Sequence, residues 1–249
     1  YKAAGSVVSL KQAPQLSPAA RAIVDSVGAQ GEVKRLVEIR VPELIAFQDE
    51  AYAQRYADVI KRVVATEHRV LPGSQLSEAA ARYLYKLMAY KDEYEVARLY
   101  TDGEFLKKLG TQFEGNYKLT FHLAPPLFAD RDPTTGQLKK SEFGSWMMPA
   151  FRLLASLKRL RGSKLDIFGY TEERRMERRL IGEYEATVEA LLATLGQDNH
   201  AMAIQIAALP ETMRGFGHIK EKNVKAAKER EATLLAAYKS PATQSVAAE

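Results

Sequence analysis

The sequence contains no cysteine and a single tryptophan. Without cysteine, this chain cannot form a disulfide, bind zinc or an iron–sulfur cluster through thiolates, or use a cysteine nucleophile. Its apolar runs all fall short of the roughly 18 residues that a membrane span requires, and its N-terminus lacks the basic and apolar blocks of a secretion signal. We therefore expect a cytoplasmic protein without a membrane partner.

Short catalytic motifs are also missing from the sequence. It has no GxxxxGK[ST], GxGxxG, GxSxG or HExxH pattern, so the usual phosphate-binding, nucleophilic and zinc-protease signatures are excluded. The histidines, His68, His122, His200 and His218, lie far apart, and none has another histidine three or four residues away. His122 is a candidate ligand contact, but a solvated histidine explains it more simply. The pattern therefore predicts no metal site.

The composition is that of an ordinary folded protein. The chain has 249 residues, of which 46% are hydrophobic and 27% charged, enough for one large domain or two small ones. It begins at Tyr1 without an initiator methionine and ends in "KSPATQSVAAE", a small polar stretch that we expect to be loose. Both ends indicate a part of a longer polypeptide.

Helical patterns dominate the first third of the chain. Ser17 followed by Pro18 predicts a helix start, with an end near Gly28. A second helical pattern starts near Gln30 and continues to about residue 64, broken or kinked at Pro42. Next, Ser77 is expected to cap a helix over "EAAARYLYKLMAYKD".

The middle of the chain has the alternation of a strand. In "YKLTFHLAPP" the residues Tyr117, Leu119, Phe121 and Leu123 alternate with polar ones before a pair of prolines. A partner strand is expected in "SVVSL" near the N-terminus or in "GQLKKSEF" after the "DPTTG" turn. Helices resume in "WMMPAFRLLASLKRL", in a segment that we expect Thr171 to cap and Gly196 to end, and in "HIKEKNVKAAKEREATLLAAY". The predicted fold is mainly α, with a small β-ribbon near residues 117–124.

Two polar clusters have a structural and a functional interpretation. In "AYKDEYEVARLY" we expect Tyr90, Tyr94 and Arg98 on one helical face, beside an ion pair of Lys91 with Glu95, and we interpret the run as a packing face. In "RGFGHIKEK" the side chains of Arg214, His218 and Lys220 surround two glycines at the mouth of the last helix. They form a candidate anion-binding site, with a simple helix-to-helix corner as the alternative.

The third cluster is basic. Residues 152–179 contain nine basic and four acidic side chains, so this segment alone carries a net charge of +5. Aromatic residues are not interleaved with the bases, which argues against nucleic acid as a partner. A candidate partner-docking face consists of four arginines that share an arc of about 140° on a helix, namely Arg174, Arg175, Arg178 and Arg179. A solvated helix face is the alternative.

Several long runs together resemble a known family. They are "KLMAYKDEYEVARLYTDG", "FHLAPPLFADRDPTTG", "FGSWMMPAFRLLASLKRLRG", "ERRMERRLIGEYEATVEALL" and "RGFGHIKEKNVKAAKERE". In this order they resemble the C-terminal region of the fused indolepyruvate ferredoxin oxidoreductases, which belong to the 2-oxoacid:ferredoxin oxidoreductase superfamily. The likeness extends from about Val33 to Tyr238. It implies three parts: a linker and short helix over residues 1–32 from a preceding domain, a helical C-terminal domain over 33–238, and a loose tail over 239–249.

The resemblance also implies a function for the whole enzyme. Such enzymes serve aromatic amino acid catabolism: they convert arylpyruvates and coenzyme A into aryl-acetyl-CoA and carbon dioxide, and they pass electrons to ferredoxin. Their thiamine diphosphate, Mg²⁺ and [4Fe-4S] clusters are expected on other segments or chains, because the sequence has neither the GDG motif nor cysteine. No catalytic, cofactor-binding or metal-binding residue carries over to this chain.

We therefore expect an accessory or assembly domain that is inactive alone. Its partners would be other domains or subunits of the oxidoreductase, and ferredoxin is a candidate partner. The alternative is a stand-alone helical binding module whose anion site lies near Arg214 and His218.

Overall fold

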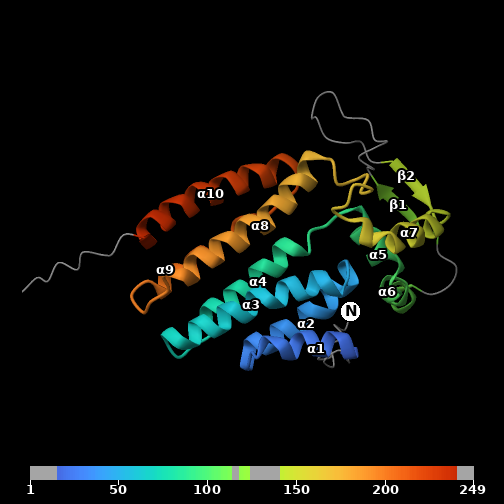
Figure 1. Cartoon of the computed structure of the whole chain (residues 1–249). Coiled ribbons are helices and arrows are strands. Elements are labelled where there is room, and N and C mark those ends of the chain that lie inside the picture. Colours follow the sequence, from blue (N-terminus) through green and yellow to red (C-terminus); the bar gives the residue numbers. More distant parts are fainter. Residues whose placement is uncertain (1–15, 114–117, 124–140, 240–249) are drawn as a thin grey trace, which may run out of the picture. The chain divides into compact units, whose positions relative to one another are not determined.

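The computed structural model describes residues 16–113, 118–123 and 141–239 (Figure 1). The chain divides into two compact units: unit 1 comprises Tyr1–Tyr85 and Glu185–Glu249, and unit 2 comprises Lys86–Tyr184. The predicted fold class is confirmed, because the described part of the chain is mainly helical and has one two-stranded sheet. Five predicted features lie outside the described residues: the "SVVSL" strand, Tyr117, the two prolines of "YKLTFHLAPP", the "DPTTG" turn and the tail from residue 240.

The first three helices of unit 1 are α1 (Pro18–Val27), α2 (Gly31–Phe47) and α3 (Glu50–Val70), and they pack on one another. As predicted, the side chain of Ser17 caps α1, where it accepts a hydrogen bond from the Ala20 N–H, and Gly28 ends the helix in the left-handed conformation. Ile23, Val24 and Val27 of α1 are buried. Residues 18–27, expected in a linker segment, thus contribute to the core of unit 1.

Pro42 does not break the second helix, so the predicted break at this residue is wrong, and the kink that was its alternative stays a prediction. Helix α2 continues through Pro42 to Phe47, and the break comes at Gln48 and Asp49. The reason is the cap of the next helix, because the side chain of Asp49 accepts a hydrogen bond from the Tyr52 N–H and fixes the start of α3.

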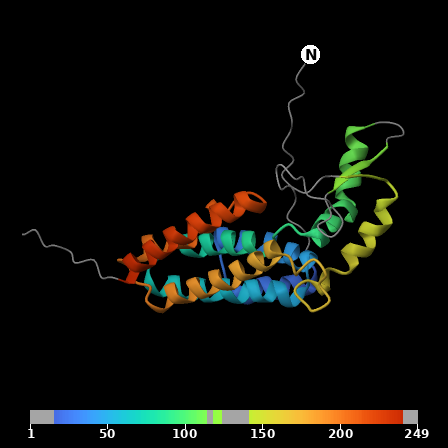
Figure 2. The ribbon, with the colours of Figure 1, turned by 90° about the horizontal axis from the view of Figure 1, so that it is seen from above.

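The remaining helices of unit 1 are α4 (Gln75–Met88), α8 (Glu172–Ala193), α9 (His200–Ala207), the short 3₁₀ helix η2 (Leu209–Thr212) and α10 (Gly217–Lys239). Of these, α4 and α8 continue into unit 2. Within unit 1, α3 and α8 are joined by ion pairs from Arg55 to Glu185 and from Arg62 to Glu189. The phenol of Tyr238 on α10 donates to the Leu191 carbonyl on α8 at 2.8 Å, and Figure 2 shows these two helices side by side.

Two predicted helix boundaries of α4 were wrong. Helix α4 starts at Gln75, so Ser77 lies inside its first turn and is buried rather than acting as the cap. At the other end, the expected single helix stops at Met88, and Asp92 starts a new one, α5 (Glu93–Thr101). Tyr90 therefore does not share a helical face with Tyr94 and Arg98.

Unit 2 is built from α5, α6 (Glu104–Gln112), β1 (Thr120–Leu123), β2 (Ser141–Gly144), α7 (Met147–Ser156), the 3₁₀ helix η1 (Lys158–Leu160) and the start of α8. The strands pair antiparallel, with Phe121 opposite Phe143 and His122 opposite Glu142. Of the predicted partner segment "GQLKKSEF", the described residues Ser141–Phe143 pair with the predicted strand, and residues 136–140 lie outside the described part of the chain. Figure 1 shows the ribbon beside α5 and α7.

A small aromatic cluster joins these elements. Ala97 of α5, Phe121 of β1 and Phe151 of α7 are buried at its centre. The Phe121 ring lies 5.0 Å from the Tyr100 ring and 5.2 Å from the Phe151 ring, between centroids. Edge-to-face pairs at such distances stabilise a core beyond simple burial. Across the described residues of both units, no helix is long and apolar enough to cross a membrane.

Candidate functional site

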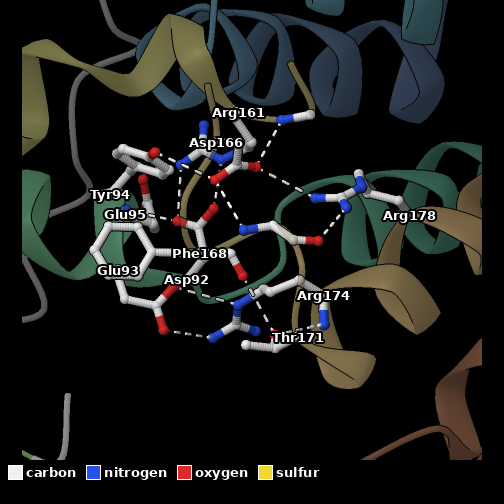
Figure 3. Close-up of polar contacts among 12 residues, drawn as sticks. Asp92, Glu93, Tyr94, Glu95, Arg161, Asp166, Phe168, Thr171, Arg174 and Arg178 are labelled. Atoms are coloured by element: carbon white, nitrogen blue, oxygen red, sulfur yellow. Dashed lines mark hydrogen bonds and ion pairs between the residues drawn. The ribbon is translucent and has the colours of Figure 1, made fainter. Parts of the chain in front are cut away.

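The most connected group of charged side chains lies in unit 2, around two buried aspartates (Figure 3). It comes from the start of α5, from the loop that follows η1 and from the first turns of α8. We call it the Asp92–Asp166 cluster, and its members are Asp92, Glu93, Tyr94, Arg161, Asp166, Arg174 and Arg178.

Asp92 has two structural tasks. Its Oδ1 accepts a hydrogen bond from the Glu95 N–H at 2.8 Å and so caps α5. The same carboxylate binds Arg161 through two bonds, with Nε donating to Oδ2 at 2.5 Å and Nη2 donating to Oδ1 at 2.8 Å. Only 2% of the Arg161 side chain and 3% of the Asp92 side chain are exposed. This is a desolvated, two-pronged ion pair.

Arg161 stays charged although it is buried. Burial alone would lower its pKa, but the hydrogen bond and the charge of Asp92 outweigh this, so the pKa of Arg161 is raised above its ordinary value. Its guanidinium carbon also lies 5.4 Å from the centre of the Tyr94 ring, within the range of a cation–π contact. The site therefore holds one positive charge fixed against one negative charge.

The loop after η1 closes around the carboxylate of Asp166. Its Oδ2 accepts from the Gly162 N–H at 2.8 Å, and its Oδ1 accepts from the Gly169 N–H at 3.0 Å and from the Tyr94 hydroxyl at 3.2 Å. Arg178 reaches Oδ2 from α8 at 3.3 Å and also donates to the Gly169 carbonyl. Asp166 thus ties the loop to α5 and α8.

Gly169 is required by this packing. A Cβ atom on residue 169 would lie 2.6 Å from Asp166 Cγ and 2.8 Å from Arg178 Nη1, closer than real Cβ contacts. Its backbone conformation is ordinary, so the constraint is space and not a positive φ. Only glycine lets the loop backbone approach the carboxylate.

Two tyrosines of this region are held in their neutral form. Burial, followed by the charge of Asp166 and the hydrogen bond to it, raises the pKa of Tyr94 well above its usual range. Burial and the charge of Asp92 raise the pKa of Tyr90 to about 12. Neither phenol can act as a base near neutral pH. Tyr94 serves as a hydrogen-bond donor, and its ring packs edge-on against Phe168 at 5.5 Å.

The four arginines of the predicted docking face do not form one exposed surface. Arg174 is mostly buried, with 13% of its side chain exposed, and its guanidinium lies 3.4 Å from the carboxylate of Glu93. Arg178 binds Asp166 as described above. Arg175 and Arg179 are exposed on α8 and pair with Glu172 and Glu183 of the same helix. Helical spacing predicts the shared arc, but the acids that draw two of these side chains inward are distant in sequence.

The predicted anion site near the last helix is likewise spread out. Arg214 is exposed and bonds Glu211, with Nε donating to the carbonyl and Nη2 3.1 Å from the carboxylate. His218 and Lys220 both lie in the first turn of α10, two positions apart, and side chains at this spacing do not face each other. The helix therefore points these two side chains to different sides.

Unit 1 contains a second buried polar site, which the sequence analysis did not identify. Glu67, near the end of α3, is fully buried, and its carboxylate accepts bonds from the N–H groups of Leu76 and Ser77 at 2.8 Å each. The Ser77 hydroxyl donates to the same group at 2.5 Å, and His200 Nε2 lies 2.8 Å from it. Glu67 therefore caps α4 from another helix and joins α9 to both.

These contacts determine the charge state of Glu67. Burial alone would raise its pKa, but the bonds from Ser77, His200 and the two N–H groups outweigh burial and lower the pKa below its ordinary value. Because an ionised carboxylate only accepts, Nε2 of His200 carries the proton. One signal was available in the sequence. An acid in the last turns of a helix interacts unfavourably with the negative end of the helix dipole, so its presence there indicates that its carboxylate binds another element.

Both sites share one chemical character. Each acid accepts several hydrogen bonds from the chain itself, and each is placed where it joins elements that are distant in sequence. Among the described residues no group of three or more histidines and acids could hold a metal ion. The geometry of both buried sites is that of structural cross-links.

One surface depression of unit 1 lies between α3 and α8 and is lined by Ala51, Gln54, Arg55, Asp58, Val59, Arg62 and Glu185.

Comparison with known proteins gives one result that covers these sites. A family model matches residues 33–233 and is described as a family of unknown function, DUF6537. Comparison with the curated proteins and with the solved structures gave no match. The matched segment includes every member of the Asp92–Asp166 cluster as well as Glu67, Ser77 and His200. Because the match covers most of the length of this chain, the chain belongs to the DUF6537 family.

Proposed function

We propose that the chain is an accessory, assembly-type helical domain of an indolepyruvate-type 2-oxoacid:ferredoxin oxidoreductase. In this proposal the chemistry belongs to other segments or subunits, which carry thiamine diphosphate, Mg²⁺ and the iron–sulfur clusters. The proposal starts from the ordered sequence runs between Val33 and Tyr238 that resemble the C-terminal region of those enzymes.

One structural observation favours a structural role over a catalytic one for the residues of the Asp92–Asp166 cluster. Three of the runs that carry the resemblance meet in the Asp92–Asp166 cluster: "KLMAYKDEYEVARLYTDG" supplies Asp92, "FGSWMMPAFRLLASLKRLRG" supplies Arg161, and "ERRMERRLIGEYEATVEALL" supplies Arg178. Their charges are neutralised by one another. A catalytic acid or base needs access to a reacting atom, whereas these groups face inward. Residues from three of these runs thus serve to hold unit 2 together.

The first experiment uses the chain by itself. We expect a folded helical protein by circular dichroism that shows no iron–sulfur absorbance and reduces no dye when given indolepyruvate and coenzyme A. Turnover by the isolated chain would overturn the accessory role.

The second experiment uses the parent oxidoreductase. Deletion of the segment that corresponds to residues 33–233 should dissociate the assembly in analytical sedimentation. It should also lower the rate of ferredoxin reduction about tenfold or more, which corresponds to a rise of at least about 1.4 kcal/mol in the activation free energy. Thiamine and iron content per remaining polypeptide should not change. A deleted enzyme with the parent's assembly state and rate would contradict the proposal. The variant Arg175→Glu with Arg179→Glu tests whether the two exposed arginines of α8 take part: if they do, its rate deficit shrinks as salt rises.

A further inference from the structure

Helix α7 is apolar on two sides. One side packs into the aromatic cluster of unit 2 through Phe151, which is buried, and through Met147 and Leu154, which are partly buried. These three residues recur at steps of three and four and therefore lie on one face of the helix. This face accounts for the position of α7 against α5 and the ribbon.

The opposite side of α7 is also apolar, and it faces solvent. We call it the α7 outer face, and its members are Trp146, Pro149, Ala150, Leu153 and Leu157, all of them exposed. At 100° per residue they fall within an arc of about 100°. Trp146 is 66% exposed and Leu153 is 65% exposed. Single exposed apolar residues are common, but a continuous helical stripe of five marks an interaction surface.

The charges around this face indicate the chemistry of its partner. Residues 143–165 contain five basic side chains and no acidic one. One of them, Arg161, is buried against Asp92, whereas Arg152, Arg159 and Lys164 are exposed and make the surroundings of the outer face positive. A second copy of this chain would bring the same positive surroundings against them, and like charges oppose such pairing. An acidic partner is complementary.

From these observations we propose that the α7 outer face docks an acidic amphipathic helix of a protein partner, with the partner's apolar stripe against Trp146 and Leu153 and its acids beside the surrounding bases. Helix α7 has 10 residues, a length of about 15 Å at 1.5 Å per residue, so about three turns of a partner helix cover it. This inference rests on unit 2 alone and does not depend on the proposed parent enzyme.

The single tryptophan makes the inference directly measurable. Trp146 is the only tryptophan of the chain, and it lies on the outer face, so its fluorescence reports burial of this surface. Two stapled helical peptides serve as probes: both carry the same leucine stripe, which is bordered by glutamates in one and by lysines in the other. We expect the acidic peptide to shift Trp146 emission to shorter wavelength, to saturate, and to bind about tenfold or more tightly than the basic peptide, with an affinity that falls as salt rises.

A matched pair of variants tests the location. Leu153→Glu should weaken the acidic peptide about tenfold or more, whereas Ile219→Glu, on the exposed part of α10, should leave its binding unchanged. Both variants should keep the parent's circular dichroism, since both positions are exposed. Equal binding of the two peptides, no saturable shift, or normal binding by Leu153→Glu would each overturn the proposal. A dimer in sedimentation that Leu153→Glu dissociates would assign the face to a second copy and would also overturn it.

Discussion

The two units of the chain use different means to hold their helices together. Unit 1 packs long helices through aliphatic side chains such as Val37, Leu44 and Ile60, which are fully buried. Unit 2 has a small aromatic cluster around Phe121 and relies in addition on the buried pair of Asp92 and Arg161. Buried ion pairs add little net stability compared with apolar packing, but they are costly to break. Unit 1 has a buried cross-link of its own, Glu67 with His200, but a larger aliphatic core surrounds it. Unit 2 should therefore be the more sensitive unit to single polar changes.

The units also differ in what they leave exposed. Among the described residues, nine of the eleven exposed large apolar side chains belong to unit 2: Leu99, Leu106, Phe113, Trp146, Leu153, Leu157, Leu165, Ile167 and Tyr170. The other two, Phe216 and Ile219, belong to unit 1. Apolar surface of this extent in a small unit is typical of a part that binds another protein. We therefore expect contacts with another protein to be made by unit 2 rather than by unit 1.

The largest effect is expected from Phe121→Asp, which places a carboxylate in the aromatic cluster of unit 2. Loss of the buried ring and desolvation of the new charge should lower the free energy of unfolding by about 4 kcal/mol or more. Denaturant titration followed by circular dichroism measures it. Leu165→Asp, at a position that is 70% exposed, is the control and should change stability by less than about 0.5 kcal/mol. Equal midpoints for the two variants would refute burial of the strand.

Asp92→Ala removes the partner of a buried charge. Arg161 would be left desolvated and α5 uncapped, so we expect a loss of about 3 to 4 kcal/mol. Asp92→Asn keeps the cap and should cost about 1 kcal/mol less. The double variant with Asp92→Leu and Arg161→Met should recover most of the stability. Glu104→Ala, which breaks the exposed pair of Glu104 with Lys107, should cost less than about 0.5 kcal/mol. If Asp92→Ala and Glu104→Ala lower the free energy of unfolding by the same amount, the pair of Asp92 and Arg161 is not desolvated.

Two glycines of unit 2 give changes of opposite sign. Gly169→Ala forces a methyl group against Asp166 and Arg178 and should destabilise the protein by about 1 to 3 kcal/mol. Gly182 lies inside α8 with nothing within 4 Å of its Cβ position. Gly182→Ala should therefore stabilise the helix by about 0.5 to 1 kcal/mol. Thermal unfolding of both variants measures the difference, and a stabilised Gly169→Ala protein would show that the loop does not close on Asp166.

The sequence predicts those parts of the fold that are fixed by neighbours along the chain. Ser17 with Pro18, the alternation around Phe121 and the cap by Thr171, whose Oγ1 accepts from the Arg174 N–H at 3.3 Å, are local patterns, and the structure confirms them. The helix break before α5 was missed because Asp92 fits a helical pattern as well as a cap. With the break in place, Glu95 pairs with Arg98.

The buried sites could not be predicted in the same way. Asp92 and Arg161 are 69 positions apart, and Glu67 and His200 are 133 positions apart. No periodicity relates residues at such separations, because their contact depends on how whole helices pack. The sequence indicates that Arg174 and Arg178 share a helical arc, but the acids that bind them come from α5 and from the loop after η1.

The smallest expected effect concerns pH and the cross-link of unit 1. Because the folded-state pKa of Glu67 lies below its ordinary value of 4.5, its contribution to stability is complete above that pH and is lost as the pH falls through the folded-state pKa. The unfolded chain takes up the proton first, so the free energy of unfolding should decrease with falling pH below about 4.5. The Nε2 atom of His200 faces the same carboxylate at 2.8 Å. Glu67→Gln removes the titrating group and should flatten this part of the profile, whereas Glu221→Gln, on the exposed side of α10, should keep the parent's slope. Identical slopes for Glu67→Gln and the parent in urea titrations between pH 3 and pH 5 would show that the buried carboxylate of unit 1 does not carry the charge that its hydrogen bonds imply.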